Sequence, residues 1–203
     1  AATLAGAVVM VGTGYRGFVL FIGFLLITQL QMLNEGKPQT APRSAWEEAA
    51  TTLRAGKPAK ARRMLLAALS HPQPTAAVPD LTLTAPDAAA LIDLLPDPLP
   101  HGDPGNEYVL AKLLLTTRRF DEAAHYAAGS FDRNPNTLSA AIVARAAAAL
   151  GDQATAIGWL QTGADVGTST AGLATTIDRA PELASVRLHP SVVAIRRSLA
   201  PIA

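Results

Sequence analysis

From residue 44 onward, apolar positions recur with the three-to-four spacing of amphipathic helices, and no long run alternates apolar with polar residues. Residues 108–127 contain two such helices, separated by a short break at 117–120. The same pattern returns in residues 140–164, with its break at 151–153. The pattern predicts an all-α fold in which pairs of helices repeat.

The two helical pairs share a register as well as a pattern. Ala123 and Ala156 occupy the same place in the second helix of each pair, 33 positions apart, and Pro135 closes the first pair. A period in the low thirties with two helices per unit is typical of helical-repeat proteins. In these residues the chain resembles the tetratricopeptide-repeat (TPR) family. The resemblance implies a short α-solenoid whose inner helices line a concave, protein-binding groove. Arg118, Ser130 and Gly163 depart from the family pattern, and we expect them to alter the helix packing.

The rest of this region is predicted to extend the array. Residues 44–75 form a divergent first repeat, which opens on a capping box at Ser44 and Glu47. Residues 76–103 are a proline-rich insertion with one helix at 86–95, capped by Thr84 and Asp87, followed by extended loop through residue 105. The insertion either covers an edge of the array or has no special role.

Residues 104–203 hold the two regular repeats and a terminal cap. Residues 163–170 are predicted to be loop, 171–177 helical, and 191–199 a last amphipathic helix. In that helix Val192, Val193 and Ile195 face inward, and Arg196 and Arg197 face the solvent.

The amino-terminal stretch has a different pattern. Residues 17–33 carry no charge and would reach roughly 26 Å as a helix, which predicts a membrane span rather than a buried core helix. Residues 1–11 are also apolar, and the glycine-rich turn 12–17 would make residues 1–33 a membrane hairpin. Residues 34–43 are a polar linker.

Lysine and arginine are concentrated after residue 33, which places the carboxy-terminal part in the cytoplasm by the positive-inside rule. The heavy use of alanine, arginine and proline is typical of a high-GC bacterial gene. We therefore expect a protein of the bacterial inner membrane, with membrane lipid among its partners.

Composition excludes several chemistries. The chain has no cysteine and a net charge of +1, so neither a disulfide nor a cysteine-ligated metal is expected, and nothing indicates a nucleic-acid partner. The four histidines are scattered and are expected to be exposed or to cap helices. The glycines at 12, 14 and 17 lack the strand of a dinucleotide site. The sequence thus predicts no enzyme activity, cofactor or metal.

One set of side chains is a candidate binding surface. In the TPR register, the inner helices would place Trp46, Arg54, Tyr108, Lys112 and Arg145 along one concave groove. Cations beside aromatic rings hold carboxylates through charge-assisted hydrogen bonds and ring contacts. The groove is therefore predicted to bind an acidic peptide segment or a free carboxylate; the alternative is that these charges are ordinary solvated residues.

Three functions are compatible with these features. The first is a membrane-anchored TPR-like scaffold that docks a protein partner or serves as an accessory or structural subunit of an integral membrane protein complex. In the second, the chain is similar to the carboxy-terminal, non-catalytic region of bacterial site-2-type intramembrane zinc proteases, without their His-Glu-x-x-His motif. The third is a regulator that binds anionic lipid through its arginine pairs.

Overall fold

A computed structural model describes residues 44–71 and 83–199, and all regular secondary structure in these ranges is helical. The predicted all-α class is confirmed for this part of the chain. The predicted membrane segment (1–33) and linker (34–43) lie outside the described residues. No helix in the described part is long and apolar enough to cross a bilayer.

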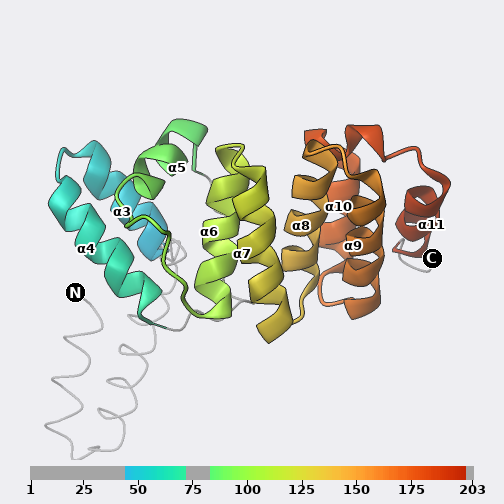
Figure 1. The fold of residues 1–203 in the computed structure, drawn as a ribbon, viewed down its shortest axis with the longest axis horizontal. Coiled ribbons are helices and arrows are strands. Elements are labelled where there is room, and N and C mark those ends of the chain that lie inside the picture. Colours follow the sequence, from blue (N-terminus) through green and yellow to red (C-terminus); the bar gives the residue numbers. More distant parts are fainter. Residues whose placement is uncertain (1–43, 72–82, 200–203) are drawn as a thin grey trace, which may run out of the picture. The chain divides into compact units, whose positions relative to one another are not determined.

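The helices follow one another as neighbours (Figure 1). The first five described helices are α3 (Ala45–Arg54), α4 (Pro58–Leu69), α5 (Ala85–Ile92), α6 (Pro104–Thr116) and α7 (Phe120–Arg133). They are followed by α8 (Thr137–Ala149), α9 (Gln153–Val166), α10 (Thr170–Arg179), the 3-10 helix η2 (Pro181–Ser185) and α11 (Pro190–Ser198). The pairs α3–α4, α6–α7 and α8–α9 pack together across short turns, and α7 packs on α8.

The predicted capping box at the start of α3 is confirmed. The Ser44 hydroxyl accepts a hydrogen bond from the Glu47 amide at 3.2 Å, and the Glu47 carboxylate accepts one from the Ser44 amide at 3.3 Å. Two of the free amides at the helix start are satisfied in this way. Pro58 is the first residue of α4, where the fixed φ of proline suits a helix start.

The turns within the three helical pairs have the same backbone geometry. Gly56, Arg118 and Gly151 have φ angles of +73°, +62° and +86°, and each lies two residues before the first residue of the second helix of its pair. Arg118 stands where the family pattern has glycine, and the sequence predicts that it alters the packing. The backbone there nevertheless adopts the left-handed conformation of the two glycine turns, at the steric cost that a side chain incurs.

Helix α5 lies between the first helical pair and the second. It packs against both α3 and α6 (Figure 1), and the end of α4 meets α6 directly, where the Asn106 side chain donates to the carbonyl of Ala68. The loop after α5 is tied down, since the Tyr126 hydroxyl donates to the carbonyl of Leu99 at 2.5 Å and Arg133 Nη1 donates to the carbonyl of Gly102 at 2.8 Å. The extended loop ends at Asp103, earlier than predicted, because this carboxylate caps α6.

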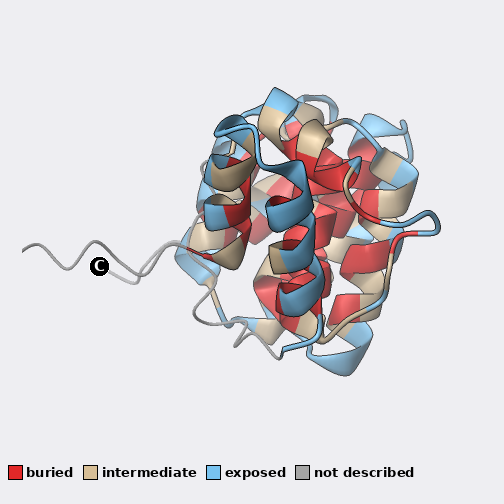
Figure 2. Cartoon of the chain, turned by 90° about the vertical axis from the view of Figure 1, so that its left-hand side faces the viewer, coloured by how far each residue is buried: buried red, intermediate tan, exposed pale blue. Residues whose placement is uncertain are grey.

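The core forms in two clusters that meet at α8. One joins Trp46, Leu65 and Leu110 with the helices around them, and the other joins Leu160 with Leu183 near the carboxy terminus. Buried positions gather on the inward faces of the helices and exposed ones on the outside (Figure 2). Alanines on nearly every face of α8 let the neighbouring helices approach closely. Each fully buried leucine in the core contributes about 1.5–3 kcal/mol to the free energy of unfolding.

The carboxy-terminal boundaries differ from the predicted ones. Helix α9 continues through Gly163 to Val166, because Gly163 packs closely against Ala140 of α8 rather than breaking the helix. Gly167, with φ of +66°, ends it. In the last helix Val192 and Ile195 are buried as predicted, while Val193 is only half-buried.

Candidate functional site

A pocket of about 420 Å³ lies over α6, α8 and α10, and three of the five predicted groove residues line it. Helix α6 contributes Tyr108 and Lys112, which lie one turn apart and therefore point the same way. Helix α8 contributes Arg145, 33 residues after Lys112. The helical register thus places these three side chains on one surface, as the repeat period predicted.

Both apolar and polar side chains line the pocket. Leu138 and Ile142 of α8 are apolar lining residues, and Thr175 and Thr176 belong to the wall that α10 forms. Each threonine hydroxyl donates to a carbonyl one turn back in its own helix, at 2.9 Å. Because a hydroxyl oxygen also accepts, this wall can receive hydrogen bonds from a ligand. The pocket lining includes two cations and no carboxylate among the described residues.

Glu182 fixes the position of Arg145. The Nε and Nη2 atoms of Arg145 each donate to one carboxylate oxygen of Glu182 at 3.1 Å, in a bidentate pair. The side chains are 27% and 15% exposed, so the pair is partly removed from water. Glu182 thereby offsets the charge of Arg145. Relief of repulsion between Arg145 and Lys112 is therefore not a driving force for binding an anion in the pocket. A guanidinium has five N–H donors, and Glu182 uses two, so Arg145 retains donors for a second carboxylate.

The other two predicted groove residues lie elsewhere. Trp46 is fully buried in the core between the first helices. Arg54 forms a bidentate ion pair with Asp87 of α5, at 2.9 and 2.7 Å. The Arg54 hydrogen bonds hold the pKa of the Asp87 carboxyl well below its usual range. Helix α5 separates these two residues from the pocket, and for this reason the predicted five-residue surface is shorter than expected.

A second group of polar residues, which the sequence did not indicate, surrounds the buried carboxylate of Glu107. His101 Nδ1 lies 3.0 Å from Glu107 Oε1, the amide of Gly102 donates to the same oxygen at 3.3 Å, and Arg133 pairs with Oε2. The His101 ring stacks on Tyr126, whose pKa is raised chiefly by burial and further by the charge of Glu107. The group holds the insertion loop against α6 and α7.

The histidines are exposed or lie at helix ends, as expected, but they are not all scattered, because the centroids of the His101 and His125 rings lie 5.9 Å apart. His189 caps α11 by accepting from the Ser191 amide at 3.3 Å, His71 lies 2.7 Å from the carbonyl of Ala67, and His101 and His125 are exposed. Within the described ranges, no three histidine or acidic side chains are grouped in a way that would hold a metal ion.

No protein-family model, curated protein or solved structure matches the chain. Two features therefore bear on its function. One is the pocket over α6, α8 and α10, which we call the inner groove, and the other is the predicted membrane segment.

Proposed function

We propose that this protein is a membrane-anchored, TPR-like scaffold that binds an acidic segment of a partner protein in its inner groove. The observation that carries the proposal is the placement of Lys112 and Arg145 beside Tyr108 around one pocket. These are the side chains that recognise carboxylates, and they come from equivalent places in successive helical pairs.

The three left-handed turns support the repeat architecture. Gly56, Arg118 and Gly151 end the first helix of each pair with the same backbone geometry, and the last two lie 33 residues apart, as Lys112 and Arg145 do. A scaffold of stacked pairs presents its inner helices side by side, which suits an extended peptide more than a small enclosed ligand.

At the Arg145 end of the groove, the guanidinium donors that Glu182 leaves would bind a carboxylate, against repulsion from Glu182 itself. A charge-assisted hydrogen bond contributes about 1.5–3 kcal/mol when it is removed from water, and an exposed one contributes about 0–1 kcal/mol. Arg145 is 27% exposed and held by Glu182, so little side-chain freedom is lost when a second carboxylate binds. Apolar contacts with Leu138 and Ile142 would add to this.

The membrane attachment rests on the uncharged stretch at residues 17–33. It would hold the helical pairs on the cytoplasmic side of a bacterial inner membrane, next to the integral membrane proteins that are its candidate partners. We assign the chain no catalytic role of its own, since the groove presents binding groups and no paired nucleophile and base among the described residues.

Titration of labelled acidic peptides tests the proposal. Wild-type protein should bind a glutamate-rich peptide and not its glutamine-matched counterpart, and Lys112→Glu with Arg145→Glu should abolish binding without loss of helicity. Lys57→Glu with Lys60→Glu changes the net charge by the same amount on α4, and it should bind normally. Equal loss in both double variants would mean that overall charge, and not the inner groove, drives binding.

A further inference from the structure

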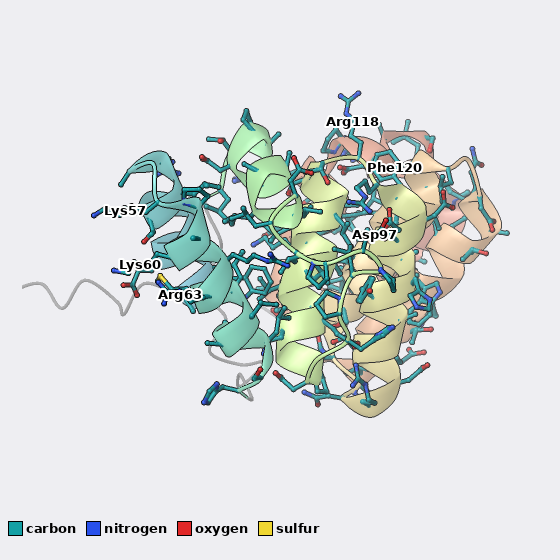
Figure 3. The ribbon with its side chains drawn as sticks, turned by 60° about the vertical axis from the view of Figure 1, so that its left-hand side comes forward. Lys57, Lys60, Arg63, Asp97, Arg118 and Phe120 are labelled. Atoms are coloured by element: carbon teal, nitrogen blue, oxygen red, sulfur yellow. The ribbon has the colours of Figure 1, made fainter. Side chains whose placement is uncertain are left out.

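The outward face of α4 is strongly basic. Lys57, Lys60, Arg62 and Arg63, which we call the basic face, are all exposed. Lys57, Lys60 and Arg63 point away from the neighbouring helices (Figure 3). The sequence contains no acidic residue from position 49 to position 79, and within the described part of the chain none of these four cations has an ion-pair partner.

Helix α4 does not need these charges for its own stability. It packs on the core through Ala61, Leu65 and Ala68, which lie on the opposite side from the basic face. Its first turn contains no acidic residue, and Lys57 sits at the N-cap without a side-chain capping bond. Cations at this end oppose the helix dipole, which favours negative charge there. The arrangement therefore costs stability in the isolated helix, and a negatively charged surface would offset that cost.

We propose that the basic face of α4 lies on the anionic lipid headgroups of the membrane that anchors the chain. This inference rests on the proposed membrane attachment but not on the inner groove. The predicted membrane segment ends at Leu33, and the ten residues 34–43 can span at most about 35 Å before Ser44 begins the first helical pair. If residues 17–33 anchor the chain, contact between α4 and the headgroups is an intramolecular step with a high effective concentration.

The surface also suits a membrane more than a nucleic acid. The chain as a whole has a net charge of only +1, so the excess of positive charge is local. Leu66, at 36% exposed, lies on the same side of α4, and Ala59 and Ala67 are exposed beside it. Small apolar side chains and the aliphatic stems of lysine and arginine can pack at the membrane interface while the charged groups contact the headgroups.

Charge sets the expected size of the effect. A lysine or arginine close to an anionic leaflet strengthens the attraction about five-fold, and the effect falls off within a Debye length of about 8 Å. Neutralising Lys57, Lys60 and Arg63 together should shift the balance between lipid-contacting and free α4 by roughly a hundred-fold.

The absence of cysteine allows a direct test with the full chain reconstituted into vesicles. Ala67→Cys places an environment-sensitive fluorophore on the exposed side of α4, and Ala194→Cys places the same fluorophore on the exposed side of α11. Headgroup-nitroxide lipid should quench the Ala67 probe in vesicles that contain phosphatidylglycerol, and much less in phosphatidylcholine alone. The Ala194 probe should respond to neither.

Charge variants separate lipid contact from folding. Lys57→Gln, Lys60→Gln and Arg63→Gln combined should abolish quenching at unchanged helicity. Lys57→Arg, Lys60→Arg and Arg63→Lys combined should retain it, because the headgroup field acts on charge and not on geometry.

Several results would overturn the inference: equal quenching in the two lipids, no quenching in either, quenching that survives neutralisation, or a response of the Ala67 probe to added RNA but not to vesicles. If the chain fails to sediment with phosphatidylcholine vesicles, the proposed membrane attachment is wrong. Quenching by phosphatidylglycerol vesicles would then still show that the basic face binds anionic lipid, but the inference that it lies on an anchoring membrane would fail. The peptide titration of the inner groove is unaffected.

Discussion

The turn between α6 and α7 should be the most strained of the three equivalent turns. Arg118 has a φ of +62°, and this conformation costs a residue with a side chain about 1–2 kcal/mol. Replacement by glycine relieves the strain but raises the entropy of the unfolded chain, which costs about 0.5–1 kcal/mol. The relief of strain exceeds the entropic cost, so Arg118→Gly should stabilise the protein by about 0.5–1 kcal/mol.

Arg118→Ala is the matched control, because it removes the exposed guanidinium and keeps the strained backbone. Thermal unfolding followed by circular dichroism should show a higher Tm for Arg118→Gly, by about 1–4 °C, and little change for Arg118→Ala. Gly151→Ala should do the reverse. A Cβ added at Gly151 meets no atom within 4 Å, so its loss of about 0.5–1 kcal/mol would come from the backbone alone.

A Tm for Arg118→Gly no higher than that for Arg118→Ala would refute the strained turn. It would also remove the main support for treating Arg118 as the equivalent of Gly56 and Gly151.

Three further substitutions probe the packing. Asn106→Ala should cost about 1–3 kcal/mol in urea unfolding, because the buried Asn106 amide donates to the carbonyls of Ala68 and His71 at 2.8 and 2.9 Å. Trp46→Ala should cost about 3–5 kcal/mol by the same measurement while peptide binding to the folded protein is unchanged, since Trp46 lies in the core and not in the inner groove. Asp87→Asn should lower the Tm at neutral pH, because the pKa of Asp87 is lowered in the folded state and its carboxylate therefore stabilises the fold. This stabilisation is present above the ordinary aspartate pKa of about 3.9 and is lost as pH falls through the lowered value. The Tm values of wild type and variant should therefore converge only in strong acid.

Local signals in the sequence were sufficient for most of the helices. The capping box at Ser44 and Glu47 marks a helix start through chemistry contained within a few residues. Pro104 falls within the predicted extended loop, although it is the first residue of α6. The prediction that a loop begins at Gly163 is wrong. Gly163 lies against Ala140 of another helix, and there a small residue permits close packing instead of ending its own helix.

The candidate site could be predicted only where the repeat period applies. The period relates Lys112 to Arg145, and both line the pocket. It says nothing of Glu182, which pairs with Arg145 from 37 residues away and belongs to the non-repeating end of the chain. The period also fails for Trp46 and Arg54, because the insertion places α5 between them and the second helical pair.

The central claim, that the inner groove holds an acidic segment of a partner, is tested most directly by site-specific photo-crosslinking in intact membranes. Thr175, exposed at the wall of the groove, would carry the photoreactive amino acid, and Gln161, exposed on α9, would carry it in the control. We expect a discrete adduct from position 175 that is absent from position 161 and is lost with Lys112→Glu and Arg145→Glu. The partner peptide in this adduct should be rich in aspartate or glutamate. An adduct that persists in the double variant, or that forms equally from position 161, would contradict the central claim.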